Sequence, residues 1–189
     1  MSQAPRSRQS RSARTPSLGA GDGPIEVVEY DEGWPACYLA ERARLASLLP
    51  ELRLQHIGST AVRGLAAKPV IDMIAFVEDL DARTDQLVQQ AGYHLPERFN
   101  ADLEHRRFLC YPDPSHRTHH LHLVDQSEGL ESCLLFRDRL RDDPKLAAEY
   151  ATLKRALAER FREDRLRYTE AKSSFIKNAL GQAASQKRS

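Results

Sequence analysis

Apolar residues recur along the chain with spacings that predict strands first. The patterns over residues 25–30 and 52–57 predict two short strands. The near-continuous apolar run over residues 70–77 is typical of a central strand that is covered on both faces. Residues 107–111 and 118–124 flank a Pro-Asp-Pro-Ser turn, so we expect them to pair as an antiparallel hairpin.

Helical spacing dominates the rest of the chain. Residues 34–49 predict a helix with Glu41 on its polar face. Another helix, capped by an aspartate at position 79 or 81, follows the apolar run, and the pattern stays helical from about residue 128. The chain therefore predicts an α+β fold, in which helices pack on a small mixed β-sheet and the C-terminal third is helical.

The two ends of the chain differ from this pattern. Residues 1–23 are rich in Arg, Ser and Pro and hold one large apolar side chain, so we expect a disordered tail. Contact of this tail with nucleic acid, or a role as a transit peptide, is the alternative to an inert extension. Residues 24–180 are expected to form a single domain, and residues 181–189 to fray.

Composition narrows the functional classes. The formal net charge of +1, from 28 basic and 27 acidic residues in 189, gives no overall attraction to nucleic acid or anionic lipid. Nucleic acid is not expected as a partner, and an anion must be bound by a local arrangement. No apolar run approaches the ~20 residues that a membrane span needs. We expect a soluble cytoplasmic protein with no membrane partner and reduced, buried cysteines; the oligomeric state is not indicated.

Candidate chemistry is concentrated just before and inside the central strand. In a turn such as Gly58-Ser59-Thr60, a phosphate can lie against free backbone N–H groups, although most Gly-Ser turns bind nothing. Asp72 adds weight to this turn, because a buried carboxylate is costly unless a cation or hydrogen-bond donors hold it. Lys68 is a candidate either for the ion-pair partner of Asp72 or for a phosphate contact.

Two histidines form a second candidate group. His120 and His122 lie two residues apart on a predicted strand, so their side chains share one face. The pair can coordinate a metal ion, donate to phosphate oxygens or act as a general base, or it can be a plain polar sheet face. Some charged and aromatic side chains elsewhere are candidates for further ligand contacts and otherwise belong to the surface. These are Arg107, Lys154, Tyr168 and Lys172.

Six sequence blocks, in order from about residue 25 to 180, resemble the GrpB family. The blocks are Tyr30-Asp31-x-x-Trp34-Pro35, His56-Ile57-Gly58-Ser59-Thr60-x-Val62-x-Gly64-Leu65-x-Ala67-Lys68-Pro69-x-Ile71-Asp72, His119-His120-Leu121-His122, Phe136-Arg137-Asp138-x-Leu140, Glu149-Tyr150-x-x-Leu153-Lys154 and Tyr168-Thr169-x-x-Lys172. The family resembles the nucleotidyltransferase superfamily in fold, and its domain also occurs fused to dephospho-CoA kinase. The resemblance implies a nucleotidyltransferase-like fold and a nucleotide-related role.

In that superfamily a Gly-Ser turn holds a triphosphate, and three carboxylates hold metal ions. By position, Gly58 and Ser59 match the turn and Asp72 matches the first carboxylate. The second carboxylate should stand at position 74, where this chain has Ile74. Two-metal phosphoryl transfer needs anionic ligands, so the implied site is depleted. A further departure is Arg63, where the family usually has proline.

The resemblance thus implies Mg²⁺ or Mn²⁺ at Asp72 and His122, with His120 completing the ligand set or acting as a base. Gly58, Ser59, Thr60 and Lys68 would contact the phosphates. The leading hypothesis is a protein that binds a nucleotide or a phosphorylated small molecule, with metal-dependent nucleotidyl transfer as its activity. The alternative is a non-catalytic accessory or sensor module linked to coenzyme metabolism. A third is a helical protein-interaction surface on a sheet scaffold.

Overall fold

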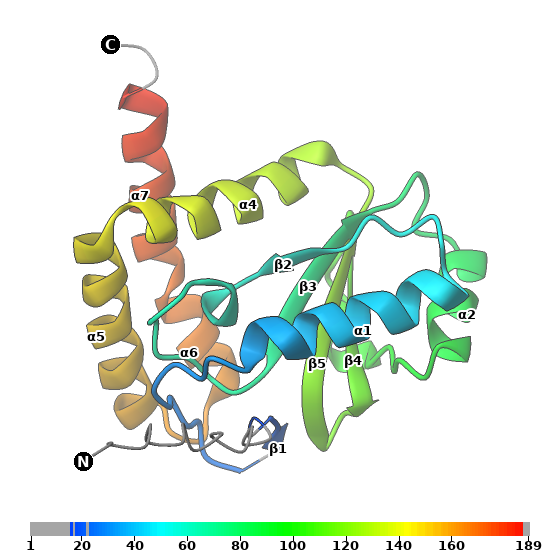
Figure 1. Cartoon of the computed structure of the whole chain (residues 1–189), viewed down its shortest axis with the longest axis horizontal. Coiled ribbons are helices and arrows are strands. Elements are labelled where there is room, and N and C mark those ends of the chain that lie inside the picture. The colour runs from blue at the N-terminus through cyan, green and yellow to red at the C-terminus, as the bar shows by residue number, and fades with distance from the viewer. Residues whose placement is uncertain (1–15, 17, 22, 187–189) are drawn as a thin grey trace, which may run out of the picture.

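The computed structural model describes residues 16, 18–21 and 23–186, with side chains up to residue 181. A five-stranded mixed sheet forms its centre, with helices at both ends and across both faces (Figure 1). The elements are β1 Ala20–Gly21, α1 Trp34–Leu48, β2 Gln55–Ile57, the 3-10 turn η1 Ser59–Ala61, β3 Ile71–Phe76, α2 Ala82–Gln90, α3 Glu97–Asn100, β4 Arg106–Asp113, β5 His116–Val124, α4 Ser127–Asp142, α5 Pro144–Arg160, α6 Arg165–Ala171 and α7 Ser173–Gln186. The predicted α+β fold with a helical C-terminal third is confirmed.

Strand pairing places β3 and β5 at the centre of the sheet. The order is β1-β5-β3-β2, and β4 pairs with the other edge of β5. β3 and β5 are parallel, whereas β2 with β3, β4 with β5 and β1 with β5 are antiparallel. The predicted hairpin is therefore present as β4 and β5, and the apolar run over residues 70–77 is a central strand.

One face of the sheet carries the main hydrophobic core. Met73 and Ala75 of β3 lie on it with Leu121 of β5, and all three are fully buried. Trp34 of α1 and Val88 of α2 pack against them in the same cluster. Burial of each large apolar side chain stabilises the fold by about 1.5–3 kcal/mol, so this face fixes the register of the sheet.

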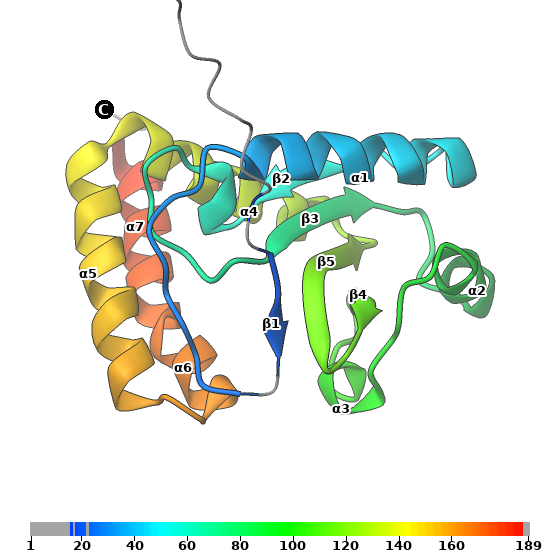
Figure 2. The same ribbon diagram turned by 60° about the horizontal axis from the view of Figure 1, so that its bottom comes forward.

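The opposite face is divided between a small apolar cluster and polar groups. Near the end of β3, Ile74 packs with Ile57 and Val124 against apolar side chains of α4. Near its start, Asp72 lies on the same face, and its charge acts on Lys154 and Lys172 from the helical C-terminal part. Helices α5, α6 and α7 stand beside this end of the sheet, and the loop between β2 and β3 lies between them and the strands (Figures 1 and 2).

Three local expectations differ from the structure. Residues 25–30 form no regular strand; Val28 makes an isolated bridge to Ala67 instead, because the segment runs beside the β2–β3 loop rather than along the sheet. Glu41 is buried, not exposed, because the Tyr93 hydroxyl and the Arg44 guanidinium donate hydrogen bonds to its carboxylate. Leu48, which the helical pattern over residues 34–49 places on the apolar face with Trp34 and Leu45, is 53% exposed near the end of α1.

The chain ends also differ from expectation where they are described. Most of the segment expected to be a disordered tail lies outside the described residues, but Ala20–Gly21 form β1 and pair with Arg117 and His116 of β5. The structure gains this pairing because the start of β5 extends past β3. At the other end, α7 continues to Gln186, beyond the expected boundary at residue 180. No described helix is long and apolar enough to cross a membrane.

Candidate functional site

The Gly-Ser turn leaves β2 through a glycine that no other residue can replace without strain. Gly58 has φ +69° and ψ −171°, a region of backbone conformation that is essentially restricted to glycine. A Cβ atom at this position would lie 2.5 Å from Asp72 Oδ2. The turn and the carboxylate are therefore in direct contact, although they are separated along the sequence.

Asp72 is held by one histidine of the neighbouring strand. His120 Nδ1 lies 2.8 Å from Asp72 Oδ1, and because a carboxylate only accepts hydrogen bonds, Nδ1 is the donor. The Asp72 side chain remains 30% exposed. Burial raises the pKa of Asp72, but the His120 hydrogen bond and the nearby His122 and Lys68 outweigh it and hold that pKa well below its ordinary value.

His122 contacts an arginine of the neighbouring strand β4. Arg106 Nε donates to His122 Nδ1 at 3.2 Å, which requires that nitrogen to be unprotonated. Burial, followed by the charge of Arg106, lowers the pKa of His122 well below its ordinary value. The strands place His122 beside Ile74 and His120 beside Asp72. Asp72 therefore bonds His120, whereas His122, the second predicted metal ligand, bonds the Arg106 guanidinium.

Lys154 of α5 reaches the turn from the helical side. Its Nζ donates to Ser59 Oγ at 2.8 Å and to the backbone oxygen of Ala66. The residue is 2% exposed. Burial, followed by the charges of Lys172 and Arg155, lowers its pKa from 10.5 to about 7. A lysine so deeply buried beside another lysine is costly unless an anion joins it.

Two further lysines complete a cationic group around Tyr168. Lys68 Nζ and Lys172 Nζ lie 5.3 Å and 4.3 Å from the centre of the Tyr168 ring. Burial, followed by the charge of Lys172, lowers the pKa of Lys68 to about 8, and burial lowers the pKa of Lys172. The charge of Asp72 acts on both lysines and on Lys154. We call Lys68, Lys154 and Lys172 the lysine cluster.

The cluster should impose an unusual pH dependence on stability. At pH 8 the unfolded chain keeps the Lys154 proton, whereas the folded protein, with a pKa of about 7, has largely lost it. The unfolded state then binds more protons, so the free energy of unfolding is expected to rise by about 1 kcal/mol per pH unit between pH 7 and pH 8.5. Urea denaturation measures this slope. Lys154→Met should flatten it, and an equal slope in both proteins would contradict the assignment.

Arginines of α4 fix the turn from the other side. Arg141 Nε donates to the backbone oxygen of Ala61 at 3.1 Å, and an Arg137 amino group donates to that of His56 at 3.0 Å. The His56 ring stacks on Tyr38, with ring centres 4.6 Å apart. These contacts hold the turn by its carbonyl oxygens, so its first N–H groups are still able to donate hydrogen bonds.

The structure brings together some of the predicted residues and separates others. Gly58, Ser59, Asp72, His120, Lys68, Lys154, Tyr168 and Lys172 meet in one place. Thr60 does not join them, because its hydroxyl donates to the Val70 carbonyl oxygen and contacts His56 Nε2. Arg107 lies on the opposite face, where it bonds the Leu80 carbonyl oxygen and faces Asp85.

Sequence reasoning missed Arg141 and the role of Tyr150. Arg137 stands in one of the sequence blocks that carry the family resemblance, but its bond to the turn was not predicted. The Tyr150 ring centre lies 4.8 Å from Lys154 Nζ. Tyr150 and Lys154 are four residues apart on α5, so they share one face of the helix. The position of Lys154 in line with the apolar residues of α5 was the sequence signal that could have predicted this contact. Arg141 gave no signal, because its acceptor is a backbone atom of a distant loop.

The side chains at this site do not fit a resident divalent metal ion. Mg²⁺ and Mn²⁺ prefer several oxygen ligands, but the site offers one carboxylate, and His120 already bonds one of its oxygens. Within the described residues, no group of three or more His, Cys, Asp or Glu side chains could hold a metal. The lysine cluster supplies positive charge that acts together with the charge of Asp72.

Comparisons with known proteins agree on one family. A sequence profile described as "GrpB protein" matches residues 24–182. The crystal structure of conserved protein GrpB from Enterococcus faecalis matches with a TM-score of 0.74 and 33% identity, covering 87% of this chain and 100% of that one.

Two longer relatives contain a similar segment. "UPF0157 protein YqkA" of Bacillus subtilis is 37% identical over 82% of this chain and 46% of its own length. A "Dephospho-CoA kinase" of Mycolicibacterium paratuberculosis is 33% identical over 85% of this chain and 46% of its own length. The chain therefore spans about half the length of these two relatives.

Proposed function

The chain belongs to the GrpB family, and from the lysine cluster at its Gly-Ser turn we propose that it binds the phosphate groups of a nucleotide or another phosphorylated small molecule. The observation that carries this proposal is the meeting of one buried lysine, Lys154, and two partly buried lysines, Lys68 and Lys172, with a single carboxylate. Lys68, Lys154 and Lys172 each have a lowered pKa, and burial is the main cause in each case.

Electrostatics favour an anionic ligand here. When all three lysines are protonated, their ammonium groups outnumber the single carboxylate of Asp72, which His120 already engages. Removing ammonium groups from water costs several kcal/mol each unless counter-charge accompanies them. A phosphate brings two negative charges and several acceptor oxygens. The uncompensated cluster therefore favours a function in ligand binding over one in stabilising the fold.

The geometry of the turn suits phosphate in particular. Lys154 Nζ, which bonds Ser59 Oγ, lies beside the start of the η1 turn. The leading N–H groups of such a turn have no partner within it and can donate to an oxygen anion. We assign Ser59, Lys154 and Lys172 to direct phosphate contact, Gly58 to close backbone approach, and Lys68 to long-range charge.

The residue at position 74 favours ligand binding without catalysis. Ile74 replaces the second carboxylate and is fully buried against the apolar residues of α4. A metal-binding acid at that position would have to displace a packed core. We therefore propose that the protein binds its ligand without Mg²⁺ or Mn²⁺ and acts as an accessory or sensor module. Nucleotidyl transfer is the competing function.

A thermal-shift panel tests this proposal. The ligands are ATP, GTP, inorganic phosphate, CoA and dephospho-CoA, the last two chosen because a relative bears the name dephospho-CoA kinase. We expect at least one phosphorylated ligand to raise Tm by several degrees in EDTA, with no further gain from Mg²⁺, because binding adds RT ln(1 + [L]/Kd) to stability.

The same ligands in radiolabelled form distinguish the module from the enzyme. Saturable binding without release of pyrophosphate or labelling of an acceptor supports the module. Stabilisation that appears only with Mg²⁺, together with turnover, would replace the proposed function by metal-dependent transfer. An absence of any Tm change across the panel would contradict phosphate binding itself.

A further inference from the structure

A short N-terminal segment crosses the gap between the sheet and α6. Residues 18–21, which we call the strap, pair with the start of β5 through β1. Gly19 N–H donates to the Pro69 carbonyl oxygen at 2.8 Å, and Leu18 packs against the edge of the main core. In Figure 2, β1 lies between β5 and α6. The strap therefore runs directly beside the loop that carries Lys68.

Two arginines from different elements hold the strap by its backbone. Arg117 of β5, which is 3% exposed, donates to the Gly21 carbonyl oxygen at 3.2 Å. Arg165 of α6 donates to the same oxygen and, at 2.9 Å, to that of Gly23. A guanidinium can donate two parallel hydrogen bonds to a phosphate group, and there the acceptor carries a negative charge, whereas a backbone carbonyl oxygen is neutral. An anion can therefore compete with the strap for these donors.

The two arginines border the lysine cluster. Their charges contribute to the lowered pKa of Lys68, after burial and Lys172. The positive groups thus continue from Lys154 through Lys172 and Lys68 to Arg165 and Arg117. The match to the family profile begins at residue 24, after the strap.

We propose that Arg117 and Arg165 form a second anion subsite next to the lysine cluster, and that residues 18–21 cover it. The subsite takes the distal phosphates of an extended polyphosphate, whereas a single phosphate fills the lysine cluster alone. This inference rests on the proposed function. A long anion displaces the strap as it binds. Its apparent affinity is therefore the intrinsic affinity of the open subsite multiplied by the fraction of molecules in which the strap is open.

Gly19 offers a way to release the strap without touching either subsite. Its φ is +130°, and a Cβ there would collide with the His116 ring, so Gly19→Val opposes the strap conformation by both strain and contact. Gly23→Ala is the matched control, because a Cβ at Gly23 meets nothing within 4 Å. Both variants keep every lysine and arginine of the site.

Isothermal titration with inorganic tripolyphosphate and with orthophosphate tests the subsite. We expect Gly19→Val to bind tripolyphosphate about fivefold more tightly than the wild type and to bind orthophosphate unchanged. Gly23→Ala should match the wild type for both anions. Arg165→Met, added to Gly19→Val, should remove the gain.

Each contrary result has a distinct meaning. Equal affinities of Gly19→Val and the wild type for tripolyphosphate, or equal gains for both anions, would overturn the strap and leave phosphate binding standing. Failure of every protein to bind either anion would overturn both inferences.

Hydrogen–deuterium exchange on the wild type keeps the inference testable if Gly19→Val does not fold. Saturating tripolyphosphate should speed exchange of the strap amides, and orthophosphate should not. Slower exchange with tripolyphosphate would overturn displacement.

Discussion

Replacing Lys154 with methionine is expected to weaken binding of the phosphorylated ligand by about 30- to 150-fold, as measured by isothermal titration. The ammonium group donates to Ser59 Oγ and is buried beside the turn, so its loss removes a desolvated, charge-assisted donor. Such donors contribute about 2–3 kcal/mol to binding. Methionine keeps the length of the side chain and its contact with the Tyr150 ring, so the change is mainly one of charge.

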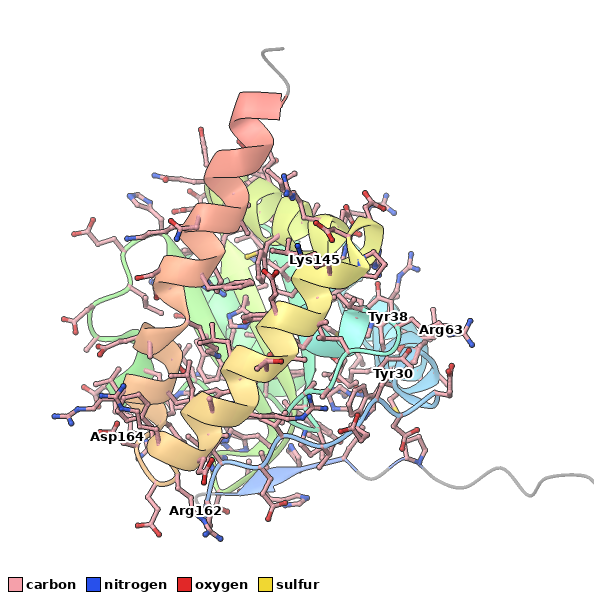
Figure 3. All side chains as sticks on the ribbon, turned by 90° about the vertical axis from the view of Figure 1, so that its left-hand side faces the viewer. Tyr30, Tyr38, Arg63, Lys145, Arg162 and Asp164 are labelled. Carbon is pink, nitrogen blue, oxygen red and sulfur yellow. The ribbon has the colours of Figure 1, made fainter. Side chains whose placement is uncertain are left out.

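Lys145→Met is the matched control for this substitution. Lys145 lies on the exposed surface at the start of the same helix, α5 (Figure 3). Both variants remove one positive charge from the molecule, so a general electrostatic effect would weaken binding equally in the two. We expect Lys145→Met to bind like the wild type. Equal losses in the two variants would rule out a local role for Lys154.

Gly58→Ala is expected to lower the free energy of unfolding by about 2–4 kcal/mol and to abolish measurable ligand binding. The new methyl group would need space that Asp72 Oδ2 occupies, at 2.5 Å, and the backbone conformation is strained for any L-residue. Relief of the contact moves Asp72 away from His120 and shifts the turn. Urea denaturation and isothermal titration measure the two effects.

Gly64→Ala separates strain from collision. Gly64 also has a positive φ, of +78°, but a Cβ there meets nothing within 4 Å. Its loss of stability should stay near 1 kcal/mol, the cost of left-handed backbone alone, with ligand binding intact. If the two variants lose equal stability and both bind ligand, the contact between the turn and Asp72 has no functional weight.

Local sequence patterns predicted much of the fold because each pattern depends only on residues within a single strand, turn or helix. The run over residues 70–77 predicted the central strand, and the turn at residues 112–115 predicted the hairpin of β4 and β5. Asp81 caps α2 as expected, accepting from the Thr84 N–H. Periodicity misplaced Glu41, because the partner that permits its burial, Tyr93, is distant in sequence.

The candidate site was predicted in its parts but not in its assembly. The turn at Gly58, the acid at Asp72 and the lysines were each singled out, yet sequence could not decide which of them meet. The parallel register of β3 and β5 decides that Asp72 joins His120, while His122 faces Ile74. The charge balance also emerges only in three dimensions, because Lys68, Lys154 and Lys172 come from three separate segments.

The lysine cluster is expected to lower the stability of the free protein while it serves ligand binding. Sites that bind charged ligands often hold groups whose burial destabilises the free protein. Lys68 and Lys154, with pKa values of about 8 and 7, are such groups. The resemblance to a metal-dependent superfamily suggested that charge on the phosphates would be balanced by Mg²⁺ or Mn²⁺. We instead propose that lysines balance it.

A crystal structure of the full chain, soaked with ATP in the presence of EDTA, locates the phosphates and so decides whether the lysine cluster binds them. We predict phosphate density within hydrogen-bond distance of Lys154 Nζ and against the Gly58–Ser59 turn, with no ion on Asp72. Phosphates that lie at the arginine-rich turn around Arg162 and Asp164 (Figure 3) and leave Lys154 and the Gly58–Ser59 turn without a phosphate contact would contradict this. So would density at the lysine cluster that appears only when Mg²⁺ is added and bridges to Asp72.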